Sequence, residues 1–360
     1  MNKIAVIGAS RGIGLRAVEI LHLNAICSPR VIVAAIADSF PVSKFDLQLK
    51  LCNFLDENSL VSAFENIDSL LLCQEALNDP QELDCIFNSA RKAKVKRIVY
   101  MCSSFEEELG SELHELFRRQ IQDYEKSSRL NNKIRSLLLS KVHCLTVLST
   151  YIVYGPHCER WTGHLADLLL RGEFGLWQNG EAKSNAVYVD NLVYAALTVL
   201  SADEKKIRGK RFFVSDIEKP SWKQLIVPIA EALDLSPDAI PSIDSFQFAR
   251  VSASKRLLSS LKTSVPANLI KRHLPQRFKL KLQKFFSVYA VAKEERESGF
   301  EAVLNRKVAL DQDSLFYQAV SKDLDSGKLT ELDYQQKVCF EDAVRRSISW
   351  LSFLSYSVNR

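Results

Sequence analysis

The chain has 360 residues, of which 47% are hydrophobic and 25% are charged, and its formal net charge is +5. This composition is that of an ordinary soluble globular protein, long enough for one large domain and a smaller one. No apolar run approaches the roughly 20 residues needed to span a bilayer, and nothing before the first expected strand resembles a signal peptide. We therefore expect a cytoplasmic protein.

The eight cysteines are scattered without CxxC pairs, at positions 27, 52, 73, 85, 102, 144, 158 and 339. Several lie inside strand-like runs, which is typical of reduced, buried thiols in a cytosolic protein. His157, Cys158 and His164 lie close together in the sequence, but no fourth ligand at the usual zinc spacing accompanies them. We expect no metal site.

The first expected element is a buried strand over residues 3–7, which leads directly into a glycine-rich turn and then a helix. Gly8 can make the tight turn, Gly12 leaves room for a pyrophosphate against bare backbone, and Gly14 allows close helix packing. We interpret this order as a dinucleotide site, and an ordinary strand-to-helix turn is the alternative. The cofactor-binding candidates in the turn are Gly8, Ser10, Arg11, Gly12, Ile13 and Gly14.

A second buried strand is expected over residues 30–37, with Asp38 at its end. A carboxylate at that place accepts hydrogen bonds from the adenosine ribose hydroxyls and favours NAD, whereas Arg11 can pair with the 2′-phosphate of NADP. Because a phosphate beside Asp38 would be repelled, we favour NAD and leave NADP open. The alternative for Asp38 is a loop carboxylate with no ligand.

Strands and helices then alternate along the first half of the chain. We expect strands over 47–54, 68–73, 97–102 and 143–153, and helices over 56–64, 81–93 and most of 105–141. This alternation predicts an α/β fold with a Rossmann-like, doubly wound parallel sheet.

Several motifs in chain order carry a resemblance to a known family. They are the G-x-x-x-G-x-G turn at 8–14, a V-Y-G-P turn at 153–156, a V-Y-V-D-N element at 187–191, a further strand at 209–215, a capping box at 221–224, and helices at 314–324 and 340–350. In this order the chain resembles the extended branch of the short-chain dehydrogenase/reductase superfamily, the NAD-dependent epimerase/dehydratase family.

The resemblance implies a dinucleotide-binding Rossmann domain over residues 1–155 and a smaller α/β substrate-binding lobe over 156–360, interleaved as one structural unit. Residues 245–315 match the family least and look like a basic insertion. Asn53, near the end of the third expected strand, is a further cofactor-binding candidate. The implied substrate is a small molecule, sugar-like or carrying another hydroxyl or carbonyl group.

The family's redox chemistry uses a serine, a tyrosine and a lysine four residues after the tyrosine. The tyrosine exchanges a proton with the substrate oxygen, the serine hydrogen-bonds that oxygen, and the lysine lowers the pKa of the tyrosine. The resemblance places the catalytic serine at Ser104 and the tyrosine at Tyr124. The lysine position is Ser128, and Arg129 points about 100° further round the helix, so it is an imperfect substitute.

Without a cation at that position, an unperturbed tyrosine with a pKa of about 10 is almost wholly protonated at neutral pH. Two hypotheses follow. The chain is an NAD(P)-dependent oxidoreductase, epimerase or dehydratase with an altered partner for Tyr124, or it is a catalytically inactive scaffold or sensor that still binds the dinucleotide. Ser149 and Ser184 stand where the family often has arginines, which weakens the expectation of a nucleotide-sugar substrate. Lys183, Arg160 or the basic insertion could supply the cations instead.

Residues 245–293 contain eleven Lys or Arg and no Asp or Glu. The formal charge of this segment, +11, exceeds the net charge of the whole chain, +5. Five apolar residues fall there at helical spacing: Phe278, Leu282, Phe285, Phe286 and Tyr289. They either pack on the substrate lobe or form a surface for a membrane or an acidic partner. No nucleic-acid recognition module accompanies the charge, so we expect no nucleic-acid partner. The sequence does not predict the oligomeric state.

Overall fold

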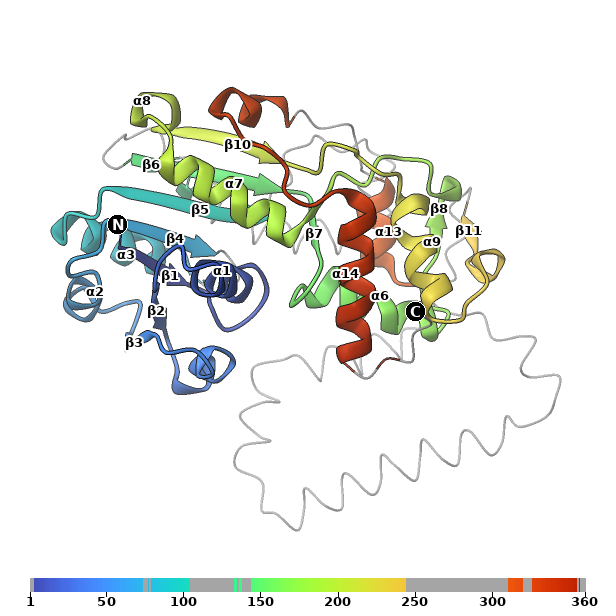
Figure 1. The fold of residues 1–360 in the computed structure, drawn as a ribbon, viewed down its shortest axis with the longest axis horizontal. Coiled ribbons are helices and arrows are strands. Elements are labelled where there is room, and N and C mark those ends of the chain that lie inside the picture. The colour runs from blue at the N-terminus through green and yellow to red at the C-terminus, as the bar shows by residue number, and fades with distance from the viewer. Residues whose placement is uncertain are drawn as a thin grey trace, which may run out of the picture. The chain divides into compact units, whose positions relative to one another are not determined.

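The computed structural model describes residues 3–73, 77, 79–103, 133–134, 136–137, 144–243, 310–319, 326–354 and 356. In this part of the chain a seven-stranded sheet has the order β10-β6-β5-β4-β1-β2-β3, and every neighbouring pair is parallel (Figure 1). The strands are β1 Ile4–Ile7, β2 Arg30–Val33, β3 Gln48–Leu51, β4 Ser69–Cys73, β5 Arg97–Ser103, β6 Cys144–Thr150 and β10 Lys210–Val214. This is a Rossmann-like order, and the predicted fold class is confirmed.

The central strands are buried and mostly apolar because helices cover a parallel sheet. All residues of β1, β4 and β6 are buried. The helices around the sheet are α1 Gly12–Leu23, α2 Glu57–Ala63, α3 Pro80–Lys92, α7 Val189–Ser201 and α8 Glu204–Ile207. Helices α1 and α7 pack side by side (Figure 1). Helices α2 and α3 bury Leu60 and Phe87 in a core cluster that includes Ile7 and Leu70.

Local capping explains where two of these helices begin. The Asp56 carboxylate accepts hydrogen bonds from the amides of Asn58 and Ser59, as expected for an acidic cap. Asp79 forms a capping box with Glu82 before α3. The predicted ranges 56–64 and 81–93 therefore agree with the observed helices to within a residue or two.

The predicted strand over 143–153 was wrong in one respect, because it is two strands in different sheets. The chain leaves the main sheet after Thr150, and β7, Ile152–Tyr154, pairs with β9, Ala186–Tyr188. An apolar run does not show where a buried strand exchanges one partner for another. The second predicted strand was also too long, since β2 ends at Val33 and a 3-10 helix, η1, spans Ile36–Val42.

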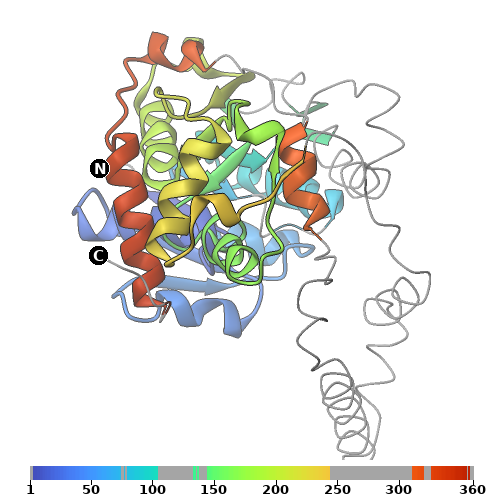
Figure 2. The ribbon, with the colours of Figure 1, turned by 90° about the vertical axis from the view of Figure 1, so that its right-hand side faces the viewer.

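The later part of the chain completes the main sheet with β10 and also builds a helical layer, which consists of α6, α9, α13 and α14 (Figure 2). Their bounds are α6 His164–Leu170, α9 Trp222–Ala232, α13 Gln312–Ala319 and α14 Phe340–Phe353. The remaining elements are β8 Leu176–Trp177, β11 Ser242–Ile243, the π-helical turn η3 Glu159–Gly163, and 3-10 turns at Gln178–Gly180, Pro237–Ala239 and Gly327–Leu332. Helix α14 lies beside α9 in both views.

All eight cysteines are free thiols, and five of them are buried. Among the described helices, none has both the length and the apolar character required to cross a bilayer.

Candidate dinucleotide site and its surroundings

The glycine turn between β1 and α1 has the backbone that its sequence requires. Gly8 has φ +96° and Gly12 has φ +53°, a region that side chains with a Cβ rarely adopt. A Cβ added at Gly14 would lie 2.1 Å from the carbonyl oxygen of Gly8 and 2.5 Å from its carbonyl carbon. Only glycine fits at this contact, and the first turn of α1 therefore lies directly against the loop.

The start of α1 is electrostatically suited to an anion. Its first turn contains no acidic residue, and among the described residues no side chain caps its N-terminus. The first amide N–H groups of a helix have no partner within the helix, and the helix dipole adds partial positive charge there. A phosphate placed at this end would be stabilised by both effects.

A cavity of about 350 Å³ opens beside the loop. Its lining residues come from the loop, from the end of β2 and the residue after it, from η1, and from the segment that follows β3: Gly8, Ala9, Ser10, Arg11, Ile32, Val33, Ala34, Ala37, Asp38, Pro41 and Phe54. These elements lie at the carboxyl ends of β1, β2 and β3, where open α/β sheets bind ligands. The volume lies within the range of small-molecule sites.

Asp38 lines this cavity, but not from the end of a strand as predicted. It lies in η1, and its amide donates to the carbonyl of Ala35 at 3.0 Å. In the sequence, the apolar residues Ala34 to Ala37 look like a continuation of the strand. Two later residues favour tight turns instead. Pro41 restricts the backbone, and the Ser39 hydroxyl donates to the Ile36 carbonyl at 2.7 Å. Arg11 and Asp38 nevertheless line the same cavity.

The remaining cofactor candidates lie beside the cavity rather than in its lining. Gly12, Ile13 and Gly14 form the first turn of α1 and are buried. Asn53 is exposed, and its side-chain oxygen accepts a hydrogen bond from the Leu55 amide at 3.0 Å. Its neighbour Phe54 lines the cavity instead.

A network of charged side chains fixes α1 to distant parts of the chain, and sequence reasoning did not find it. Arg16 on α1 forms two hydrogen bonds with the buried carboxylate of Asp190 on α7, at 2.6 and 2.9 Å. Arg346 on α14 reaches the same carboxylate at 3.4 Å. The helix that starts at the cavity is thereby held by residues far downstream.

Glu19 extends this network towards the V-Y-G-P turn. Its carboxylate pairs with Arg16 at 2.9 Å, with His157 at 3.0 Å and with Lys44 at 3.3 Å. Burial opposes its ionisation, but the hydrogen bonds from His157 and Arg16 lower the pKa of Glu19 to about 2. Glu19 is therefore ionised at neutral pH although only 6% of its surface is exposed.

The V-Y-G-P turn is fixed by a second buried polar cluster. The Tyr154 hydroxyl donates to the Asp216 carboxylate at 3.1 Å, and the Tyr188 amide and the Asn191 side chain donate to the same group at 3.0 and 2.8 Å. Burial raises the pKa of Asp216 to about 7, against the effect of these three donors. A Cβ at Gly155, with φ +118°, would lie 2.6 Å from the Tyr188 ring.

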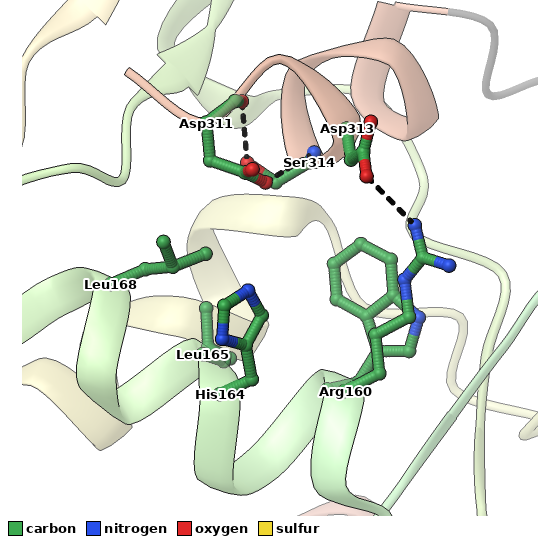
Figure 3. A pocket seen from close by; sticks show the side chains of 8 residues that line it. Arg160, His164, Leu165, Leu168, Asp311, Asp313 and Ser314 are labelled. Carbon is green, nitrogen blue, oxygen red and sulfur yellow. Dashed lines mark hydrogen bonds and ion pairs between the residues drawn. The ribbon is translucent and has the colours of Figure 1, made fainter. Parts of the chain in front are cut away.

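A smaller pocket lies in the helical layer, between α6 and α13 (Figure 3). Its volume of about 30 Å³ is room for about one water molecule. The Arg160 guanidinium lies 4.8 Å from the centre of the Tyr317 ring and 3.9 Å from Asp313. His164 also lines it, with its ring turned towards the α13 side (Figure 3). This pocket brings a cation and an imidazole together, but as it stands it does not hold a sugar-sized ligand.

Known proteins resemble this chain in one sequence segment and in the whole fold. Residues 129–244 match the model of the 3-beta hydroxysteroid dehydrogenase/isomerase family. A nucleoside-diphosphate-sugar epimerase from Pseudomonas aeruginosa superposes with a TM-score of 0.65 at 16% identity, over 99% of both chains. The chain has the extended short-chain dehydrogenase/reductase fold. The resemblance predicted from the sequence motifs is thereby confirmed.

Two further solved structures superpose in the same way. A dTDP-glucose 4,6-dehydratase from Streptomyces venezuelae has a TM-score of 0.59 at 14% identity, over 98% of this chain and 97% of that one. A UDP-glucose 4-epimerase from Thermotoga maritima has a TM-score of 0.55 at 14% identity, over 99% and 100%. No curated protein sequence matches this chain.

The predicted catalytic residues Ser104 and Tyr124 lie outside the described residues, as do Ser128 and Arg129. The expected serine and tyrosine positions therefore stay predictions. The apolar stripe and the basic residues of 245–293 also lie outside the described part of the chain.

The two serines at expected arginine positions have internal roles. Ser149 is buried in β6, with its hydroxyl 3.8 Å from the Cys102 sulfur. The Ser184 hydroxyl is fully buried and donates to the Pro220 carbonyl at 2.8 Å. Neither hydroxyl is placed to bind a diphosphate at a surface. Within the described residues there is also no group of three His, Cys, Asp or Glu side chains that could hold a metal ion.

Proposed function

We propose that this chain binds a nicotinamide dinucleotide at the glycine loop, through Gly8, Ser10, Arg11 and the first turn of α1. The observation that supports the proposal most is the contact of Gly14 with the Gly8 carbonyl beside a cavity of about 350 Å³. The dinucleotide in the dTDP-glucose dehydratase is NAD. The amides at the start of α1 would bind the pyrophosphate, and the cavity at β2, η1 and Phe54 would take the adenosine.

Asp38 and Arg11 line this cavity with opposite charges, and each favours a different cofactor. Asp38 would accept a hydrogen bond from the ribose 2′-hydroxyl of NAD, whereas Arg11 would pair with the 2′-phosphate of NADP. We favour NAD. Calorimetric titration with NADH and with NADPH tests this. Asp38→Asn should weaken the binding of NADH more than that of NADPH, and Arg11→Ala should weaken the binding of NADPH more than that of NADH.

The same titration tests the site itself. Gly12→Val introduces a branched side chain at a φ of +53° in the loop, and it should abolish binding of both cofactors. Absence of binding by the unaltered chain at millimolar cofactor would contradict the proposed site, and so would full binding by Gly12→Val.

For the chemistry, we propose an NAD(P)-dependent oxidoreductase, epimerase or dehydratase acting on a hydroxyl or carbonyl group of a small molecule. The bound dinucleotide would supply hydride transfer. Tyr124 would exchange a proton with the substrate oxygen and Ser104 would hydrogen-bond it. The substrate classes to assay are nucleoside-diphosphate sugars, after the fold neighbours, and 3β-hydroxysteroids, after the matching family model. Tyr124→Phe should remove most of any activity.

A second candidate, a dinucleotide-binding scaffold or sensor without turnover, is supported by Ser128 at the lysine position. This candidate predicts that the chain binds the cofactor, and that adding substrates of either class causes no change in NADH absorbance. Ser128→Lys separates the two further, since restoring the cation should increase the rate of an active enzyme by lowering the pKa of Tyr124.

The basic segment 245–293 remains a proposed contact for an anionic membrane surface or an acidic partner, supported by its eleven cations and no anion. Sedimentation with vesicles tests the membrane proposal. Salt-sensitive binding to anionic but not neutral vesicles, lost in Lys279→Glu/Lys281→Glu, is the supporting result. No binding at low salt would contradict it.

A further inference from the structure

The outermost strand of the sheet, β3, has an exposed, apolar edge. All four of its residues are exposed, whereas every residue of β1, β4 and β6 is buried. Leu49 and Leu51 are 40% and 55% exposed. Among the described residues, no strand pairs with the outer side of β3 (Figure 1). An exposed edge of this kind is a template for pairing with another strand.

The backbone of β3 shows which peptide groups face outwards. The amide that follows the strand, that of Cys52, donates to the carbonyl of Val33 on β2 at 2.9 Å. Because peptide groups alternate in direction along a strand, Lys50 and Gln48 also direct their N–H and C=O groups towards β2. Leu49 and Leu51 therefore present theirs outwards, to an additional strand.

The side chains of this edge are complementary to a second copy of themselves. Leu47, Leu49 and Leu51 alternate with Gln48 and Lys50, so an extended chain puts the leucines on one face and the polar residues on the other. An antiparallel pair centred on Leu49 places Leu49 opposite Leu49 and Leu47 opposite Leu51. The same register places Lys50 opposite Gln48 and diagonal to Asp46, which has the opposite charge.

Lys50 disfavours one of the two neighbouring registers, whereas the other, centred on Gln48, places Lys50 opposite Asp46 but keeps two leucine pairs instead of three. Shifting the centre to residue 50 would keep the outward peptide groups paired, but it would place Lys50 directly opposite Lys50. Centring on residue 49 avoids this repulsion and keeps all three leucine pairs. An antiparallel pair uses the same edge of both copies and therefore closes as a dimer, and the register centred on Leu49 keeps the largest number of leucine pairs.

We propose that β3 is a homodimer interface, in which two copies of this chain pair their β3 edges antiparallel about Leu49 and join two sheets into one. Ile36 and Phe40 on η1, each 67% exposed, are further exposed apolar side chains beyond the carboxyl end of β2, the neighbour of β3. A single strand pair buries less area than a standard interface, so we expect a weak, concentration-dependent dimer. The proposal does not depend on the proposed function.

Sedimentation velocity on the full chain, over about 1–50 µM, tests the dimer. We expect a dimer for the unaltered chain. Leu49→Lys and Leu49→Glu each place two like charges opposite one another at the two-fold axis, and each should raise the dissociation constant about tenfold or more. An equimolar mixture of the two variants pairs opposite charges, and it should restore the dimer.

The mixture also serves as the folding control, since two misfolded variants would not restore each other. Leu170→Lys is the matched control, because Leu170 is 50% exposed on α6 and should leave the dimer intact. The proposal is overturned if the unaltered chain is a monomer throughout the range. It is equally overturned if Leu49→Lys dimerises like the unaltered chain, or if the mixture stays monomeric.

Discussion

The cavity at the glycine loop and the pocket in the helical layer are built in different ways. The first is lined largely by backbone and small side chains of consecutive elements, and it has a volume of about 350 Å³. The second depends on side chains from distant segments, such as Arg160 and Asp313, and holds about one water. A site made by backbone can be found from a local sequence pattern, whereas a site made by long-range side-chain contacts cannot.

The largest expected effect comes from breaking the contact that holds α1, the helix beside the first cavity, to α7. Arg16→Met removes the two hydrogen bonds to Asp190 and leaves this buried carboxylate with Arg346, at 3.4 Å, as its cation among the described residues. Breaking a buried pair from one side is strongly destabilising, and we expect a loss of about 3 kcal/mol in the free energy of unfolding. Urea denaturation measures it. The exposed pair of Arg345 and Asp342 provides the control, since Arg345→Met should leave stability unchanged.

A matched pair of glycines compares the regions directly. Gly14→Ala puts a methyl group 2.1 Å from the Gly8 carbonyl, and Gly163→Ala puts one 3.9 Å from the Trp350 ring. We expect Gly14→Ala to cost about 1–3 kcal/mol through displaced backbone and to abolish dinucleotide binding, with little change for Gly163→Ala. Thermal unfolding and calorimetry measure both. Equal effects of the two substitutions would show that the loop is no more constrained than the helical layer.

A pH titration of stability isolates Glu19, which connects α1 to the V-Y-G-P turn. Its pKa is lowered from 4.5 to about 2, so the ionised form stabilises the fold above pH 4.5 and this contribution is lost as the pH falls towards 2. Glu19→Gln should therefore lower the free energy of unfolding at neutral pH by about 1–2 kcal/mol, after a discount for solvent screening. It should also reduce the loss of stability that the unaltered chain shows as the pH falls from 4.5 towards 2. If this variant loses as much stability below pH 4.5 as the unaltered chain does, Glu19 is not the source of that loss.

The smallest effect is expected inside the second polar cluster. Tyr154→Phe removes one of three donors to Asp216, a buried hydrogen bond worth about 1 kcal/mol. Tyr194→Phe removes an exposed hydrogen bond from Asn24 and should cost less. Denaturation curves for the two variants measure the difference. A larger loss for Tyr194→Phe would contradict the assignment of Asp216 as a buried anchor.

The parts that could be predicted from sequence are those with a local signal. The glycine turn, the capping box at Ser221 and Gln224, and the strand β10 each lie within a few residues, and each forms as predicted. The exit of the chain from the main sheet at Tyr151 had no such signal, because β-forming residues continue from β6 into β7 without a turn residue between them. The position of Asp38 depended on a short 3-10 helix hidden in an apolar run.

The anchors of the site could not be predicted for a different reason. Arg16, Glu19 and Asp190 read as ordinary surface charges of amphipathic helices, and nothing in one sequence pairs α1 with α7. Only the fold brings residue 16 next to residue 190. Their one sequence signal is that Asp190 follows an apolar strand without an intervening polar residue, a position that the structure buries.

The pairing of β10 with β6 also has a consequence for synthesis on the ribosome. The outer edge of β6 stays open after Thr150 emerges, until the chain has been extended to Lys210 and beyond. At about 5–20 residues per second this interval lasts several seconds. During that time the nascent chain exposes the outer edge of a seven-residue strand that is buried in the folded protein. Factors that shield nascent chains should therefore bind this protein most strongly while residues 151–209 are being made.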